Sequence, residues 1–517
     1  MSFFPEIRAL GDSIAFHAKR DPQRLALRWE GRDTTYADLE ATSNRLARTL
    51  SGEGVQRQQR VIYLGKNSED FFLAIFAVAK IGACLVPLNW RLTVAEMSAV
   101  VADIDAHYAI IDREFEATWN EIAAARRLPA RWIDAREPLR QWCGFHNPAA
   151  LEVVVEDEDP VIVLYTSGTT GQPKGVLHTH GSFNRSRKSE HLEKAFEWRD
   201  GDLFLNPLPN FHLLHIALSL QCLYNGVAIS LQKQFDPVHV LAAIGTERPT
   251  LLVLTPTLIQ MLLDHPHAAT TDFSSVRMTM YAGSPIALGL IMRAIRAMPG
   301  KFMQFYGQTE TSGPVCLLRP DEHDLGNEKK LKACGRPLPL IDLRIVDPAG
   351  VDIADGAPGE LLIKAPSTSA GYWRKPEQTD AQFRSGWYHS GDIAYRDADG
   401  LFYIYDRIKD MIITGGEIVY AAEVENAIST HPDVAAVAVV GVPDERWGET
   451  VKAIVIPRTG SAPDVAAILA HCRAVLSPYK IPKSIDFVSV FPMTGSGKVS
   501  KKELRAPYWA KQERVVS

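Results

Sequence analysis

The chain has 517 residues, more than one compact core usually supports, so several lobes are expected. Hydrophobic residues make up 46% and charged residues 23%, which excludes a disordered tail protein or a fibre. The net charge of −5 comes without a long basic run, so the cationic face that nucleic acid requires is missing and no nucleic acid partner is expected.

The N-terminus, the apolar segments and the cysteines bear on location. Residues 1–21 carry charges in their first turns and lack an apolar segment with a cleavage site, so no signal peptide is predicted. The most apolar stretch, 71–88, is interrupted by Lys80 and Gly82 and is shorter than the roughly 20 residues that span a bilayer. The six cysteines lie far apart, without metal-ligand spacing, and are expected to be free thiols. We therefore expect a cytoplasmic protein without stable membrane insertion.

In chain order, apolar runs alternate with segments of helical spacing. Helices are expected at 38–50 and 70–79, and buried strands at 60–64 and 83–87. Further runs that we expect to be central strands lie at 161–165, 203–206, 227–231 and 251–254. This alternation predicts an α/β fold with parallel strands.

The pattern of apolar runs changes twice in the last part of the chain. From about 334 to 405, short runs separated by Gly, Pro and Asp predict an antiparallel, barrel-like region. Beyond it, helices are expected at 422–429 and 465–476 and strands at 434–440 and 451–456. This pattern predicts a small α+β domain. Without a low-complexity linker, we expect domains at 1–405 and 411–517 that are joined by a short hinge at 406–410.

The sharpest local signal is a loop rich in glycine and hydroxyl residues. It follows the strand at 161–165 and comprises Thr166, Ser167, Gly168, Thr169, Thr170 and Gly171, with Lys174 shortly after. Glycines let backbone N–H groups approach a polyphosphate, hydroxyls can donate to its oxygens, and the lysine adds positive charge. The pattern GxxxxGK[ST] is not met, which disfavours a P-loop kinase or ATPase. The alternative is a plain surface loop.

Four further blocks follow this loop in a fixed order. They are YGQTE at 306–310, YHSGD at 388–392, DRIKD at 406–410 with GGE at 415–417, and PMTGSGK at 492–498. With these blocks, nearly the whole chain resembles the adenylate-forming superfamily, which includes acyl-CoA synthetases, nonribosomal adenylation domains and firefly luciferase, and it is most similar in kind to the acyl-CoA synthetases. The resemblance implies a large N-terminal domain and a small mobile C-terminal domain.

The resemblance implies a site for ATP and Mg²⁺. The glycine-rich loop, Lys174 and Thr309 would hold the phosphates, and Thr166 and Glu310 would hold Mg²⁺, since a hard cation suits oxygen ligands. Tyr306 would pack on the adenine, and Asp392 would accept hydrogen bonds from the ribose, with Arg407 nearby. Further residues placed at this site are Gly283, Ser284, Pro285, Gly307 and Gln308.

The resemblance also implies two chemical steps. The substrate carboxylate attacks the α-phosphate of ATP and pyrophosphate leaves; the acyl group then passes to coenzyme A. Lys498 would lie between carboxylate and α-phosphate, where a preorganised cation lowers the barrier, and Thr166 and Glu310 would also take part in catalysis. His212 matches a residue that guards the acyl pocket, although a histidine in an apolar stretch is more often a core residue, and His215 is assigned to packing.

For the second step, the resemblance implies that the small domain swings about a hinge. Lys409 occupies the hinge position, and Gly415, Gly416 and Glu417 would then face the site. Trp447 and Lys480 would touch the coenzyme A nucleotide, with a structural or surface role as the alternative for both. The block departs from the common family form, which has Asn and Pro where Ile418 and Ala421 stand. The chain ends 19 residues after Lys498 (517 minus 498), which favours coenzyme A over a fused carrier domain.

We therefore expect an AMP-forming ligase for a hydrophobic fatty or aromatic acid that uses ATP, Mg²⁺ and coenzyme A. Two alternatives stay open. The first is a stand-alone adenylating enzyme that loads a separate carrier protein or acts like a luciferase. The second is a non-catalytic nucleotide-binding regulator, which should lack Lys498 or Glu310, and the chain has both. The sequence leaves the oligomeric state open, and a homodimer is one of the alternatives.

Overall fold

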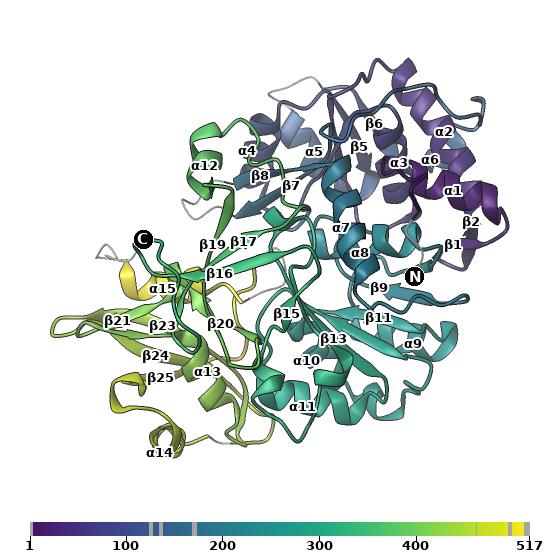
Figure 1. The fold of residues 1–517 in the computed structure, drawn as a ribbon. Coiled ribbons are helices and arrows are strands. Elements are labelled where there is room, and N and C mark those ends of the chain that lie inside the picture. The colour runs from purple at the N-terminus through teal and green to yellow at the C-terminus, as the bar shows by residue number, and fades with distance from the viewer. Residues whose placement is uncertain are drawn as a thin grey trace.

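A nine-stranded sheet forms one layer of the large domain in the computed structural model (Figure 1). The structure describes residues 4–123, 128–133, 138–167, 173–461, 463–494 and 499–510. The strands of this sheet are β1 (Leu25–Trp29), β2 (Arg32–Thr35), β9 (Leu203–Asn206), β10 (Ala228–Leu231), β11 (Leu251–Leu254), β12 (Met278–Tyr281), β13 (Lys301–Tyr306), β14 (Cys316–Leu318) and β15 (Arg336–Pro337). Its six central strands, from β13 to β1, pair in parallel, as the continuous apolar runs predict.

A six-stranded sheet forms the second layer. Its strands are β3 (Arg60–Leu64), β4 (Cys84–Pro87), β5 (Tyr108–Asp112), β6 (Ala130–Ile133), β7 (Pro160–Ser167) and β8 (Pro173–Thr179). The strands from β6 to β7 pair in parallel, whereas β8 pairs antiparallel with β7 at the edge. The end of β7 and the start of β8 therefore lie side by side, so that Thr166 is opposite Lys174.

Helices pack between and around these two sheets. They are α1 (Asp12–Arg20), α2 (Tyr36–Gly52), α3 (Glu69–Lys80), α4 (Val94–Ile104), α5 (Glu116–Ala123), α6 (Leu139–Trp142), α7 (His180–Leu192), α8 (Leu213–Tyr224), α9 (Pro237–Glu247), α10 (Pro256–Asp264) and α11 (Leu288–Ala297). In α3, every residue from Phe71 to Ala79 is buried, since a helix that is apolar all round must be covered on all sides. Its side chains share one core with strands of both sheets.

A five-stranded antiparallel sheet follows, as the Gly and Pro punctuation of the sequence predicts. Its strands are β16 (Asp342–Val346), β17 (Gly359–Lys364), β18 (Phe383–Arg384), β19 (Trp387–Arg396) and β20 (Phe402–Arg407), and α12 (Pro376–Gln382) precedes β18. The strand β19 pairs with three others, among them β20, whose last residue Arg407 is opposite Asp392. This register brings two of the sequence motifs together.

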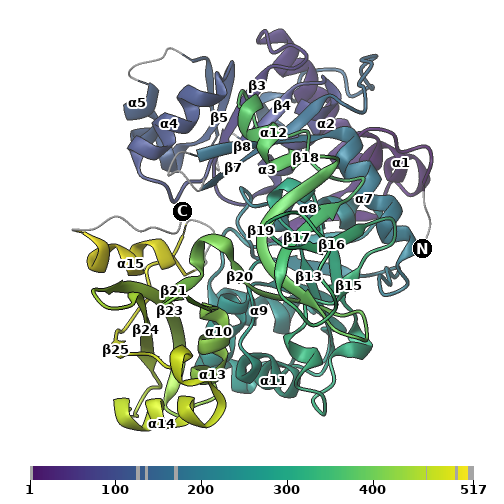
Figure 2. The same ribbon diagram turned by 60° about the vertical axis from the view of Figure 1, so that its left-hand side comes forward.

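The C-terminal part has a sheet and a core of its own (Figure 2). Its elements are β21 (Ile412–Thr414), β22 (Glu417–Val419), α13 (Ala421–Ser429), β23 (Val434–Asp444), β24 (Gly448–Pro457), α14 (Val465–Val475), β25 (Ser484–Phe487) and α15 (Lys501–Trp509). The strand predicted at 434–440 extends to Asp444 because its pairing with β24 continues as far as Gly448. A short 3₁₀ turn at Ile408–Asp410 connects β20 to β21.

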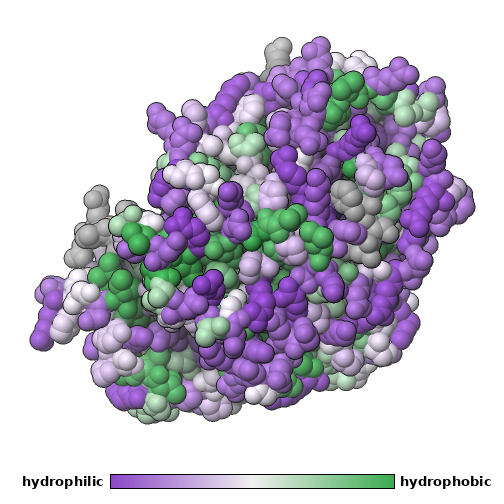
Figure 3. All heavy atoms as spheres, viewed as in Figure 1, coloured by the Kyte–Doolittle hydropathy of each residue, from purple (hydrophilic) through white to green (hydrophobic). Residues whose placement is uncertain are grey.

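The surface is mixed rather than uniformly polar. On the face shown in Figure 3, hydrophobic residues gather in a band across the middle, and most of the remaining surface of that face is hydrophilic. Within the described part of the chain, no helix is long and apolar enough to cross a membrane. All six cysteines are buried free thiols, as expected.

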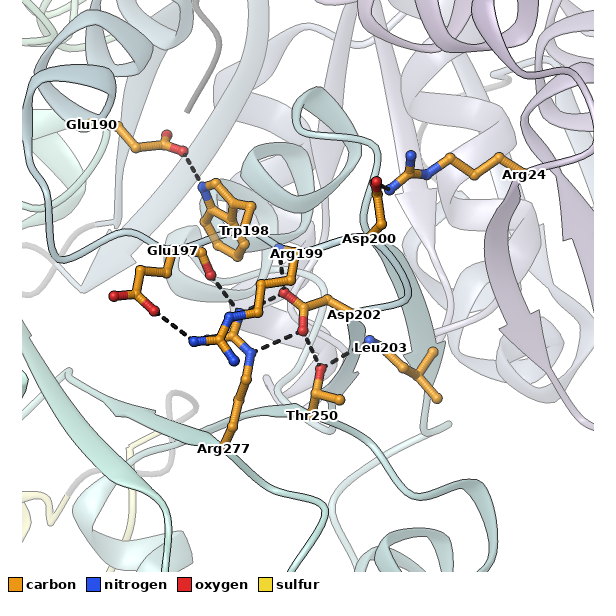
Figure 4. A network of polar contacts seen from close by, with 10 residues as sticks. All are labelled: Arg24, Glu190, Glu197, Trp198, Arg199, Asp200, Asp202, Leu203, Thr250 and Arg277. Carbon is orange, nitrogen blue, oxygen red and sulfur yellow. Dashed lines mark hydrogen bonds and ion pairs between the residues drawn. The ribbon is translucent and has the colours of Figure 1, made fainter.

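A buried polar network holds the loop before β9 against the nine-stranded sheet (Figure 4). The Asp202 carboxylate accepts hydrogen bonds from Arg277 Nε at 3.0 Å and from the Thr250 hydroxyl at 2.7 Å. Burial raises the pKa of Asp202, but the hydrogen bonds from Arg277, Thr250 and the Arg199 backbone, together with the charge of Arg277, outweigh burial and hold this pKa below its ordinary value. These residues precede or begin β9, β11 and β12, so the network fixes the amino ends of three parallel strands.

We expect the substitution Asp202→Ala to lower the free energy of unfolding of the large domain by about 3–5 kcal/mol, because it leaves Arg277 without its buried partner. Asp200→Ala is the matched control: the Asp200 side chain is 96% exposed in its ion pair with Arg24, so the loss should be about 1 kcal/mol or less. Urea unfolding followed by tryptophan fluorescence measures both variants. Equal losses for the two would contradict a structural role of the network.

Candidate functional site

The predicted site residues of the large domain lie where parallel strands end. Gly283, Ser284 and Pro285 follow β12, and the segment 307–310 follows β13. Thr166 lies near the carboxyl end of β7, and His212 follows β9. In open α/β sheets, ligands bind outside the carboxyl ends of the strands. Two parallel sheets thus direct these residues toward a common region.

Asp392 is buried and hydrogen-bonded by two residues of another predicted motif. It is 3% exposed, and its Oδ2 atom accepts hydrogen bonds from the Tyr306 hydroxyl at 2.7 Å and from Gln308 Nε2 at 2.8 Å. Its Oδ1 atom lies 3.2 Å from Arg407 Nε but accepts no hydrogen bond from the described residues. One buried carboxylate oxygen therefore keeps its capacity to accept, and the half-exposed Arg407 side chain covers it.

The side chain of Gln308 is fixed at both ends. Its Nε2 atom also donates to Ser390 O at 3.0 Å, and its Oε1 atom accepts from the Tyr388 hydroxyl at 2.5 Å. Burial, with the charge of Asp392 adding to it, raises the pKa of Tyr306, so that its hydroxyl stays protonated and donates. The predicted motifs 306–310, 388–392 and 406–410 thus meet around Asp392, the first two through hydrogen bonds and the third through an ion pair with Arg407.

A second cluster brings Lys174 toward Glu310. Glu310 lies in a 3₁₀ turn at Thr309–Thr311, and its Oε1 atom accepts a hydrogen bond from the Tyr372 hydroxyl at 3.0 Å. Lys174 Nζ lies 5.0 Å from the centre of the same tyrosine ring. Tyr372 belongs to none of the predicted motifs, and its only signal in the sequence is the aromatic pair that follows Gly371. Thr166 is opposite Lys174, and Tyr372 contacts both Lys174 and Glu310, so these residues lie in one neighbourhood.

Some predicted residues lie outside the described residues. These are Gly168, Thr169, Thr170, Gly171 and Lys498, together with the side chains of Ser167 and Lys409. The described residues before 495 pair with those after 498: Met493 forms a β-bridge with Val499, and Ser500 N donates to Pro492 O at 2.8 Å.

The two histidines near β9 differ in environment. His212 precedes the first residue of α8, is partly buried and contacts Phe211, with 4.5 Å between the ring centres. His215 is fully buried, and its Nδ1 atom lies 2.7 Å from Leu208 O. Burial lowers the pKa of His215 to about 3, so it is neutral near pH 7 and serves packing.

The segment predicted for the second step is a tight hairpin between β21 and β22. Its turn residues Gly415 and Gly416 have φ values of 60° and 86°, which glycine adopts readily. A Cβ atom on Gly415 would lie 2.6 Å from the Trp447 ring, so the close approach also requires glycine.

The other residues predicted for the second step lie around this hairpin or elsewhere in the small domain. Glu417 begins β22, Trp447 is 42% exposed, and Lys480 pairs with Glu423 at 2.7 Å. In Figure 1, β21 lies on the side of the small domain that faces away from the large domain.

Comparison with known proteins decides the family. Residues 14–373 match the family described as AMP-binding enzyme, and residues 423–498 match the AMP-binding enzyme C-terminal domain. The chain belongs to the AMP-binding enzymes. The resemblance to the adenylate-forming superfamily is thereby confirmed, as is the α/β fold with a large N-terminal and a small C-terminal domain.

Three similar proteins differ in the acceptor that their names give. The chain is 35% identical to a fatty acid–[acyl-carrier-protein] ligase of Streptomyces coeruleorubidus, over 99% of both proteins. It is 38% identical to a feruloyl-CoA synthase of an Amycolatopsis species, over 96% of this AMP-binding enzyme and 99% of the synthase. The solved structure of an amide bond synthetase from Marinactinospora thermotolerans matches with a TM-score of 0.87 and 30% identity, over 96% of this chain and 99% of that one.

We expect the substitution Asp392→Asn to weaken AMP binding by about tenfold or more, because hydrogen bonds to a charged acceptor are among the stronger ones and the carboxylate charge is lost. Asp397→Asn is the matched control, since Asp397 is also buried, in the turn that follows β19, but accepts from the Tyr403 hydroxyl at 2.9 Å. Isothermal titration calorimetry with AMP measures both. Unchanged affinity in a folded Asp392→Asn protein would contradict a nucleotide site at this cluster.

Proposed function

We propose that this AMP-binding enzyme is an AMP-forming ligase that joins a hydrophobic carboxylic acid to coenzyme A. The observation that carries the proposal is the buried Asp392, whose Oδ1 atom keeps an acceptor site beside the family's nucleotide motifs. A ribose hydroxyl that shifts Arg407 would satisfy this oxygen. The feruloyl-CoA synthase among the similar proteins supports both the acceptor and an aromatic or apolar acid.

In this proposal, two clusters hold the nucleotide. Asp392 accepts hydrogen bonds from the ribose, Tyr306 packs on the adenine, and the turn at 283–285 lies beside it. Gln308 keeps Tyr306 and Asp392 in position through its own hydrogen bonds. The glycine-rich loop from Thr166 to Gly171, Lys174 and Thr309 bind the phosphates through donors and positive charge.

The residues present fit a magnesium ion that arrives with the nucleotide. Within the described residues, no group of three acidic, histidine or cysteine side chains could hold a metal by itself. Mg²⁺ usually binds through one or two carboxylates plus substrate phosphates, and Glu310 beside the phosphate loop offers such a carboxylate. Glu310 and the Thr166 hydroxyl would hold the ion, which neutralises phosphate charge when bound.

The proposed chemistry needs no protein nucleophile. A carboxylate oxygen of the substrate attacks the α-phosphorus, the bond to the β-phosphate oxygen breaks, and pyrophosphate leaves. Lys498 supplies positive charge between the two reacting anions, where charge shifts in the transition state. In the second step, the thiol of coenzyme A attacks the acyl carbon, loses its proton, and AMP leaves with the oxygen that joined it to the acyl group.

We propose that the two steps use different orientations of the small domain, residues 411–517, about the hinge at 406–410, with Lys409 as its pivot. The hairpin with Gly415, Gly416 and Glu417 points away from the large domain in the orientation seen here, which suits the first step. Its narrow glycine turn would suit the pantetheine arm in the second step. Trp447 packs on this turn and would guide the coenzyme A nucleotide, and His212 would lie at the acyl pocket.

A second acceptor has specific support. Two proteins that are similar over nearly the whole chain are named as a ligase of a fatty acid with an acyl carrier protein and as an amide bond synthetase. These reactions share acyl activation and differ in the group that attacks. The activating half of the proposal is therefore supported by more of the comparisons than the choice of coenzyme A.

A panel of fatty and aromatic carboxylic acids tests the proposal. With ATP and Mg²⁺, a substrate acid should produce exchange of labelled pyrophosphate into ATP, and coenzyme A should raise the rate of AMP release at least about tenfold, since thiol attack replaces slow loss of the adenylate. Lys498→Ala should abolish the exchange.

The outcomes of the panel separate the acceptor from the activating step. Exchange without any effect of coenzyme A, but with AMP release on an acyl carrier protein or an amine, would replace the acceptor in the proposal. Absence of exchange with every acid, or normal exchange in Lys498→Ala, would contradict the proposed function itself.

A further inference from the structure

The segment after the antiparallel strand β17 runs back to the phosphate loop. Residues 370–373 pair with β8 through three backbone hydrogen bonds, from Ala370 N to Leu177 O at 2.9 Å, from Leu177 N to Gly371 O at 2.9 Å and from Trp373 N to Gly175 O at 2.7 Å. Tyr372 bridges Val176, two residues after Lys174. The chain thus adds a short strand to the edge where the phosphate loop ends.

Anchors on both sides fix this added strand. Trp373 Nε1 donates to Asp103 O at 3.0 Å near the end of α4, and the Trp373 ring contacts the guanidinium groups of Arg60 and Arg374, at 4.7 Å and 5.1 Å from the ring centre. On the other side, Tyr372 N donates to the Thr379 hydroxyl at 3.0 Å. Tyr372 therefore has little freedom to move relative to β8.

Tyr372 contacts two of the predicted phosphate-site residues at once. Its side chain is buried, its hydroxyl donates to Glu310 Oε1 at 3.0 Å, and its ring centre lies 5.0 Å from Lys174 Nζ. Burial, followed by the charge of Glu310, raises the pKa of Tyr372 well above its ordinary value. The phenol stays protonated near pH 7 and donates to the carboxylate.

We propose that Tyr372 is a positioning residue that orients Glu310 toward the metal of the bound nucleotide and keeps Lys174 on the phosphates. The inference rests on the proposed function, since it assigns these two residues to magnesium and phosphate. A carboxylate held through one oxygen presents its other oxygen in one orientation, which lowers the entropy that metal binding would cost. The ring restricts the long lysine side chain through a cation–π contact.

The test uses Tyr372→Phe, which removes the hydroxyl and keeps the ring. We expect the affinity for Mn²⁺, measured by electron paramagnetic resonance with a non-hydrolysable ATP analogue, to fall about tenfold, the effect of losing a hydrogen bond to a charged group. The Mg²⁺ concentration that gives half-maximal pyrophosphate exchange should rise by a similar factor. Metal-free AMP binding, which depends on the Asp392 cluster, should not change.

Two further variants sharpen the test. Tyr403→Phe removes an equivalent hydrogen bond from a buried tyrosine, to Asp397 at 2.9 Å, and should leave Mn²⁺ affinity unchanged. Tyr372→Leu removes the ring as well, so the KM for ATP should rise beyond the value for Tyr372→Phe.

Two outcomes would overturn the proposal. One is a folded Tyr372→Phe protein with unchanged Mn²⁺ affinity; the other is an equal loss of metal-free AMP binding, which would indicate a merely structural role. The Mn²⁺ titration requires only nucleotide binding, so it remains decisive even if no acid in the panel supports exchange and the proposed function fails.

Discussion

The burial of the Asp392 carboxylate is the constraint on which the arrangement of the site depends. A buried charge is costly unless hydrogen bonds and an opposite charge compensate it. Here the compensation comes from Tyr306 and Gln308, at the carboxyl end of β13 in the nine-stranded sheet, and from Arg407, on the strand β20 that pairs with β19. The hydrogen bonds from Tyr306 and Gln308 to Asp392 therefore join the nine-stranded sheet to the antiparallel one. Arg407 lies directly before the turn that leads to the small domain.

The cluster proposed to bind the phosphates also combines residues from two regions of the chain. The edge strand β8 carries Lys174, and the segment with Tyr372 pairs with that edge before the chain enters α12. Glu310 receives its hydrogen bond from this segment rather than from its own turn. Each of the two clusters is therefore completed by chain from the antiparallel region, so the proposed nucleotide site requires both regions to be folded together.

Local patterns predicted much of the fold, and long-range pairing explains the rest. Strands β3, β9 and β11 occur within the predicted bounds because each is a short, continuous apolar run. The contact between Tyr372 and Glu310 spans 62 residues, and the contact between Asp202 and Arg277 spans 75. Such contacts depend on which strands become neighbours, and one sequence contains no signal for that choice.

In the candidate site, too, the residue types could be predicted from the sequence, but their spatial arrangement could not. Its motif residues, such as Lys174, Glu310 and Asp392, were recognisable because their types and order resemble those of the family, and the phosphate and ribose binding proposed for them would restrict those types. Their geometry was not, since the register that places Arg407 opposite Asp392 arises from the pairing of β19 with β20. The similar proteins' names differ in the acceptor, so the central claim is the step before transfer, the proposed formation of an acyl-adenylate.

The fate of the carboxylate oxygens tests that claim most directly. With a substrate acid that carries ¹⁸O in both carboxylate oxygens, attack on the α-phosphorus transfers one labelled oxygen to the phosphate of AMP when the acceptor takes the acyl group. Mass spectrometry of the AMP after a complete turnover should therefore show one ¹⁸O per molecule. Unlabelled AMP, with the label in inorganic phosphate or pyrophosphate instead, would mean activation at another phosphorus atom and would contradict an acyl-adenylate.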